Sequence, residues 1–164
     1  MEESLSRELP PDMLEPGREG EHKDFLCLYK ELFALKKIDS GMYSPLVLAY
    51  IGDAVYELMI RTKIVNSGNA QVNKLHRRSA ALVKAETQAK LIYALEPYLT
   101  EEEAGVYRRG RNAKSMTVAK HATMTDYRRA TGFEALIGWL FLSERFERLA
   151  ELASMGLKEI GELT

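Results

Sequence analysis

Apolar residues recur at helical spacing along most of the chain. From about Asp24, large apolar side chains return every three or four positions as far as Leu35, which predicts a helix. Ser44 and Pro45 suit the cap and first turn of a second helix, which would run to the break at 66–68. This second helix is apolar almost all round.

Three further helical regions are predicted. The first runs from about Val72 to Ala94 and stops before Pro97. Thr100 has the form of a capping box with an acid three residues later, so another helix should begin there. The segment 110–115 has no apolar period and is interpreted as a donor-rich loop, and a last long helix is expected over about 125–154. No alternating run typical of a strand is found, so the sequence predicts an all-α fold.

The two ends of the chain differ from the middle in composition. Residues 1–22 combine several Pro and Glu residues with few large apolar ones, and we expect a disordered acidic tail. Residues 23–40 would form a helical extension, and 158–164 a short C-terminal tail. The length of 164 residues is typical of one domain, perhaps with a tail.

The net charge of −1 conceals an uneven distribution. Residues 1–40 carry 6 Lys/Arg and 10 Asp/Glu, whereas residues 104–129 carry 7 basic residues against Asp126 alone. Such an asymmetry favours a polyanion as partner of the basic segment. The single cysteine, Cys27, suits a reducing compartment, and no apolar run is long enough for a membrane span. We expect a cytoplasmic protein without membrane contact.

Two acids occupy positions that should be apolar. On the second helix, Ala49, Tyr50, Tyr56 and Ile60 fall within about 60° of Asp53, so this acid projects from an apolar face. Glu134 is the only charged residue between Phe133 and Leu142 in the last helix. An ionised carboxylate that is buried without a partner is unfavourable by several kcal/mol. Each acid could instead pair with an arginine or cap a helix, but neither has a basic residue beside it on its helix.

A shared divalent cation would compensate both acids. Carboxylate oxygens favour Mg²⁺, with Mn²⁺ as a possible substitute, and the three histidines lack the spacing of a zinc site. Gly52 and Gly138 lie inside the two helices at a cost of about 1 kcal/mol each relative to Ala. A close crossing of the helices would explain both glycines and bring the acids to one cavity; ordinary packing of small residues is the alternative.

These segments resemble a known family. YIGDAV, which contains Asp53, is similar to the signature helix of ribonuclease III catalytic domains, and FEALIG, which contains Glu134, is similar to their second acidic motif. With the intervening segments 76–83 and 109–114, they resemble the Mini-ribonuclease III branch over roughly residues 41–157. The signature helix of standard ribonuclease III carries further acids, where this chain has Leu46 and Ala49, and the second motif commonly carries an Asp, where this chain has Thr131. Two acids of the standard site are therefore missing here.

The resemblance implies an all-α endonuclease domain that forms a homodimer and cuts double-stranded RNA with Mg²⁺. It implies 5′-phosphate and 3′-hydroxyl ends, maturation of the 23S ribosomal RNA precursor, and no appended RNA-binding domain. Asp53 and Glu134 would be the catalytic metal ligands, with Glu57 as an outer group that orients water. A solvated or salt-bridged acid is an equally good interpretation of Glu57. The alternative function is a non-catalytic, ribonuclease III-like protein that binds double-stranded RNA.

Basic residues in two segments are candidates for RNA contact. A-form RNA is recognised through phosphates and 2′-hydroxyls more than through bases, which suits Arg, Lys and Asn side chains. A solvated basic face is the alternative. The candidates are Arg108, Arg109, Arg111, Asn112 and Lys114, with His76, Arg77 and Arg78 as weaker ones.

Overall fold

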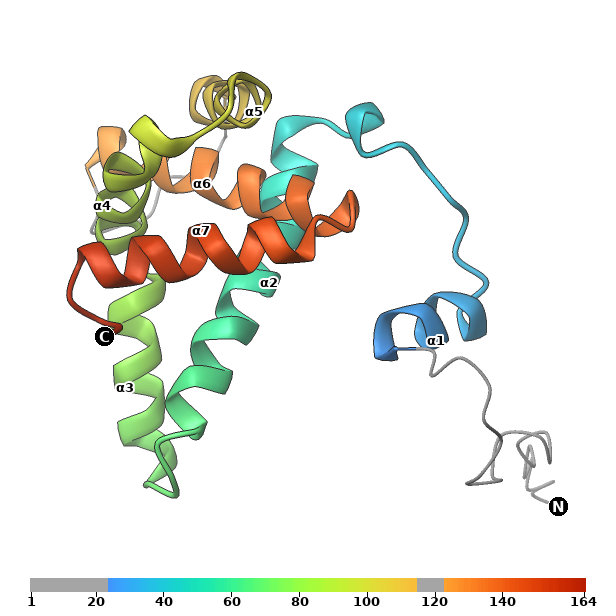
Figure 1. The fold of residues 1–164 in the computed structure, drawn as a ribbon. Helices are drawn as coiled ribbons and strands as arrows, with labels where there is room; N and C mark the ends of the chain where they lie inside the picture. The colour runs from blue at the N-terminus through green and yellow to red at the C-terminus, as the bar shows by residue number, and fades with distance from the viewer. Residues whose placement is uncertain (1–23, 115–122) are drawn as a thin grey trace, which may run out of the picture. The chain divides into compact units, whose positions relative to one another are not determined.

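The structure, a computed structural model, describes residues 24–114 and 123–164, so the predicted tail 1–22 lies outside the described residues. The chain divides into an N-terminal unit up to Lys37 and a larger unit, Ile38–Thr164. All regular elements of the described residues are helical, which confirms the all-α prediction (Figure 1). They are α1 (Phe25–Leu32), η2 (Ser40–Met42), α2 (Pro45–Val65), α3 (Val72–Val83), α4 (Ala85–Leu95), η3 (Glu96–Tyr98), α5 (Glu101–Asn112), α6 (Met124–Leu142) and α7 (Phe146–Glu159).

The predicted extension contains the short helix α1. The Asp24 side chain accepts a hydrogen bond from the Cys27 backbone N–H at 2.8 Å and caps the first turn. Phe25, Tyr29 and Phe33 place their rings in sequence along one side, with centroids 5.7 and 5.5 Å apart. None of the helices in the described part of the chain has the length and apolarity required to cross a bilayer.

Helices α2 and α6 cross at the two glycines. A Cβ atom on Gly52 would overlap the carbonyl oxygen of Glu134, and one on Gly138 would overlap the carbonyl oxygen of Leu48. The helices therefore meet backbone to backbone, which confirms the close crossing predicted from these residues. Next to the crossing, the fully buried rings of Tyr56 and Phe133 pack edge to face.

Two of the predicted helices are each divided in two, so their predicted spans were wrong. The region 72–94 breaks at Lys84, whose extended backbone (ψ 153°) separates α3 from α4. The region 125–154 breaks between α6 and α7, where Glu144 takes a positive φ of 57°. After α7, the side chains of Ile160 and Leu163 are partly buried and pack against the hydrophobic core.

The predicted loop at 110–115 is also partly wrong, because α5 continues to Asn112. A Cβ on Gly110 would lie 2.7 Å from Cβ of Ala135, so glycine at this position permits close packing of α5 on α6. Gly110 is buried against α6 but has no apolar side chain. The apolar periodicity that marks a helix in the sequence is therefore interrupted at this position. Residues 115–122, which follow, lie outside the described residues.

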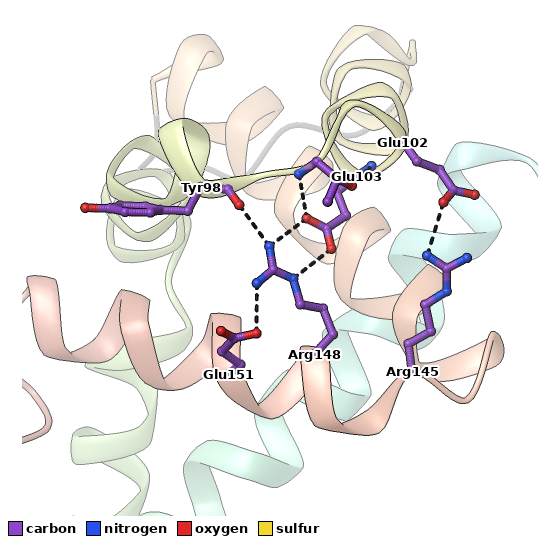
Figure 2. Close-up of polar contacts among 7 residues, drawn as sticks. Tyr98, Glu102, Glu103, Arg145, Arg148 and Glu151 are labelled. Carbon is purple, nitrogen blue, oxygen red and sulfur yellow. Dashed lines mark hydrogen bonds and ion pairs between the residues drawn. The ribbon is translucent and has the colours of Figure 1, made fainter.

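A buried ion pair joins α5 to α7 (Figure 2). Glu103, 2% exposed, completes the predicted capping box with Thr100. Its two carboxylate oxygens accept hydrogen bonds from Nε and Nη2 of Arg148 at 2.8 and 3.0 Å. Arg148 also donates to the Tyr98 carbonyl oxygen and to Glu151, each at 2.8 Å. These bonds hold the pKa of Glu103 below its usual value.

We predict that Arg148→Met lowers the free energy of unfolding by about 3 to 5 kcal/mol, because it leaves the Glu103 carboxylate buried without its cation. Because the pKa of Glu103 is lowered in the folded state, the pair stabilises the fold above the unfolded-state pKa, and this stability is lost as pH falls through the folded-state pKa. The difference between variant and parent should therefore shrink in acid. Urea unfolding at several pH values measures both effects.

Arg61→Met is the matched control, because the Arg61–Glu57 pair is exposed and follows i, i+4 spacing. This control should lower the free energy of unfolding by only about 0.3 to 0.5 kcal/mol. Equal losses for the two variants would show that the pair between α5 and α7 contributes no more than a surface pair.

Candidate active site

Asp53 lies in the middle of α2, directly after the crossing glycine. The side chain is exposed, so the expectation that this carboxylate on an apolar face is buried was wrong. The reason is that only part of this face is covered: Tyr56 and Ile60 are fully buried, whereas Tyr50 is 82% exposed. Partial desolvation, with a smaller effect of the Glu57 charge, raises the pKa of Asp53.

Glu134 lies on α6 and is partly buried. Desolvation and, to a smaller extent, the Asp53 charge raise its pKa to about 8, although the side chain of Gln88 acts in the opposite direction. The Gly52 backbone meets the backbone of Glu134 at the helix crossing, and the charge of Asp53, the next residue, acts on the Glu134 carboxyl group, so the two acids lie at one site. A cation at this site would offset both the desolvation and the repulsion.

Glu57 stands one turn after Asp53 but is engaged with Arg61. The Arg61 Nε donates to Oε1 of Glu57 at 3.0 Å, and the side chain of Glu57 is about one-third exposed. This is the salt-bridged arrangement that the sequence left open. Glu57 nevertheless contributes to the negative potential at Asp53.

The donor set fits a hard divalent cation. Asp53 and Glu134 offer carboxylate oxygens, which Mg²⁺ and Mn²⁺ prefer. Within residues 24–114 and 123–164, no three His, Cys, Asp or Glu side chains form a larger ligand cluster. The two acids are thus a sparse ligand set of a kind that Mg²⁺ accepts, because this ion commonly retains several waters.

Gln88, on α4, is a residue of this site that sequence reasoning missed. It is fully buried, and its side chain lies beside that of Glu134. In the sequence it stands between Thr87 and Ala89 in a polar stretch, where an amide gives no signal of burial. A helical projection that counted Gln88 with Leu91, Ile92 and Leu95 would have placed it toward the buried side.

The basic candidates on α5 gather at its C-terminal end. A pocket of about 550 Å³ is lined by Arg108, Arg109 and Asn112 together with Pro45, Gly105 and Ala113. Arg111 instead lies over the Tyr107 ring at 5.5 Å and donates from Nε to Asn112 at 3.3 Å. Lys114 is exposed just beyond the helix.

The candidates on α3 form a separate group. His76, Arg77 and Arg78 are all exposed. Helix α3 packs beside the later part of α2, where the Tyr56 hydroxyl donates to the Leu82 carbonyl oxygen at 3.0 Å. In Figure 1, α3 and α5 lie toward opposite ends of α2, so the structure does not bring the two basic groups together.

Comparisons with known proteins agree with this site. Residues 46–145 match the family model described as the Ribonuclease III domain. The chain is 51% identical to the Mini-ribonuclease 3 of Clostridium tetani over 73% of this chain and 80% of that protein. It is 50% identical to the Mini-ribonuclease 3 of Enterococcus faecalis over 76% and 96%.

A solved structure shows the same fold. The crystal structure of a Fusobacterium nucleatum protein superimposes with a TM-score of 0.67 at 30% identity, covering 75% of this chain and 98% of that one. The family match spans both acids of the site and the crossing that joins them. The chain therefore belongs to the Mini-ribonuclease 3 branch of the ribonuclease III family and is an endoribonuclease of double-stranded RNA.

Proposed function

We propose that Asp53 and Glu134 are the catalytic residues and hold Mg²⁺, with Mn²⁺ as a possible substitute. The observation that supports this proposal is the backbone contact at Gly52, which brings the helices that carry the two carboxylates together. When bound, the cation supplies an acidified water and neutralises charge on the scissile phosphate. The two carboxylates would hold the cation in place, and Glu57, which is paired with Arg61, would orient water at the edge of the site. The catalytic domain is assigned to residues 41–157.

The proposed substrate is the 23S ribosomal RNA precursor, cut to leave 5′-phosphate and 3′-hydroxyl ends in the cytoplasm. The support is the likeness to two proteins named Mini-ribonuclease 3. The experiment incubates purified protein and Mg²⁺ with precursor RNA and maps both ends of each product, with Asp53→Asn as control. Uncut precursor, or 5′-hydroxyl ends, would contradict the proposal.

We also propose that the protein is a homodimer that associates through α2. Val47, Tyr50, Ala54 and Leu58 lie within about 80° on one side of this helix. The three larger side chains are 46%, 82% and 67% exposed in the single chain. A contiguous exposed apolar surface of this kind is typical of an interaction site.

Leu58→Asp should convert the dimer to a monomer, because it places a charge in the apolar contact. Folding should change by less than about 0.5 kcal/mol, since the position is exposed in the single chain. Sedimentation equilibrium measures the mass. Val72→Asp, at a similarly exposed apolar position on α3, is the control. A variant mass equal to that of the parent dimer would contradict this interface.

We propose that the basic end of α5 binds RNA phosphates, and that His76, Arg77 and Arg78 on α3 extend the contact. Arg109→Ala should weaken duplex binding and reduce the slope of log affinity against log salt concentration by about 0.9 per phosphate contact removed. Binding is measured by salt titration in the Asp53→Asn background, where no cleavage interferes. Lys158→Ala, an exposed cation on α7, is the control. An unchanged salt slope for Arg109→Ala would argue for a solvated basic face.

A further inference from the structure

Gln88 has an unusual environment for an amide side chain. It is 0% exposed on α4, a helix whose neighbouring core residues, Leu91 and Ile92, are apolar. Neither its Nε2 nor its Oε1 atom has a hydrogen-bond partner among the described residues. A buried amide without partners is unfavourable relative to an apolar side chain of the same size. Packing alone would therefore be served better by Met or Leu at this position.

The Gln88 amide lies against Glu134. Helix α4 packs on α6, and the Gln88 amide lowers the pKa of the Glu134 carboxyl group, although neither polar atom of the amide forms a hydrogen bond. An amide N–H favours an ionised carboxylate, since it donates toward the negative oxygens. Gln88 thus has an unused donor beside an acid that must be ionised and oriented to bind a cation.

Other polar groups near the site are already engaged or absent. The Thr131 hydroxyl, one turn before Glu134 on α6, donates to the Tyr127 carbonyl oxygen at 3.0 Å. Ala49, one turn before Asp53 on α2, has no polar side chain. Gln88 supplies from a third helix a polar contact that these two positions do not provide.

We propose that Gln88 is a positioning residue of the active site, whose side-chain amide donates to the Glu134 carboxylate and fixes its orientation toward the cation. This inference rests on the proposed role of Glu134. The unpartnered amide N–H of Gln88 would then form its hydrogen bond when the Glu134 carboxylate is ionised. Outer contacts of this kind commonly alter metal affinity by about 10- to 100-fold when they are removed.

The test uses Gln88→Met, which keeps the length of the side chain and removes both polar atoms. Three quantities are measured: the thermal midpoint without metal, the rise in that midpoint on adding Mg²⁺ alone, and the Mg²⁺ concentration for half-maximal cleavage. The metal-free midpoint should equal or exceed that of the parent. The Mg²⁺-induced rise should become smaller, and half-maximal cleavage should require about 10- to 100-fold more Mg²⁺.

Leu91→Met is the matched control, since it changes a buried side chain of the same helix that faces Gly156 of α7. It should leave the Mg²⁺ requirement unchanged. An unchanged Mg²⁺ requirement and thermal response in Gln88→Met would overturn the inference. If that variant does not fold, Gln88→Leu replaces it, and failure of both to fold would assign Gln88 a structural role and overturn the inference as well.

Failure of the inference is distinguishable from failure of the proposed function. If Asp53→Asn and Glu134→Gln retain parental cleavage, the metal site itself is wrong. If both are inactive while Gln88→Met behaves as the parent, only the role of Gln88 is wrong.

Discussion

Asp53→Asn is expected to reduce cleavage of duplex RNA by about 10²- to 10⁴-fold, which corresponds to about 3 to 5 kcal/mol of lost transition-state stabilisation. The amide keeps the shape of the side chain but removes the charge that holds the cation. Asp53 is exposed, so its replacement should leave the helical fold intact, and thermal unfolding should confirm this. Cleavage is followed in single-turnover reactions on a model duplex with Mg²⁺.

Glu134→Gln should have an effect of similar size, because the two acids share one site. Glu147→Gln, an exposed acid in the first turn of α7, is the control for loss of a surface charge and should remain active. Duplex binding should be nearly unchanged in both site variants. Parental cleavage by either of them would contradict the assignment of the metal site.

Gly138→Ala is expected to lower the free energy of unfolding by more than about 4 kcal/mol, a loss found only for severe lesions. The added methyl group would overlap the backbone carbonyl oxygen of Leu48, which no change of side-chain rotamer relieves. Domains of this size are typically stable by about 5 to 15 kcal/mol, so the variant should be largely or wholly unfolded. Circular dichroism and urea unfolding measure the loss.

Gly105→Ala is the control for the same substitution at a position without backbone contact. Its Cβ would meet only the end of the Arg109 side chain at 3.4 Å, so it should raise stability by up to about 1 kcal/mol through helix propensity. A Gly138→Ala protein with parental stability would show that α2 and α6 have room to separate at their crossing.

The helix starts followed from local chemistry, whereas two breaks did not. Ser44 caps α2 and Thr100 opens a capping box, and the sequence predicted both because these bonds form within four residues. The break at Lys84 lies among good helix formers, and the one at Glu144 uses a positive φ without glycine. Tertiary packing decides such breaks, so a local pattern does not reveal them.

The acids of the site were found because charge on an apolar helix is conspicuous. Asp53 and Glu134 stood out against their neighbours, and the glycines beside them predicted the crossing that joins them. Gln88 was missed because an amide in a mostly polar stretch gives no sign of burial, and its burial depends on the packing of α4 on α6. The pairing of Glu103 with Arg148 joins residues 45 apart, a distance at which no local period operates.

Helix α5 is held near both ends, by the Glu103–Arg148 pair at its first turn and by the contact of Gly110 with α6 at its last. The backbone that carries Arg108, Arg109 and Asn112 is thus ordered before any ligand arrives. Ordering a residue's backbone costs about 1 to 2 kcal/mol at 25 °C, whereas these residues would lose only side-chain freedom on binding. A flexible basic segment of the same composition would bind more weakly, because part of its interaction energy would be used to order the chain.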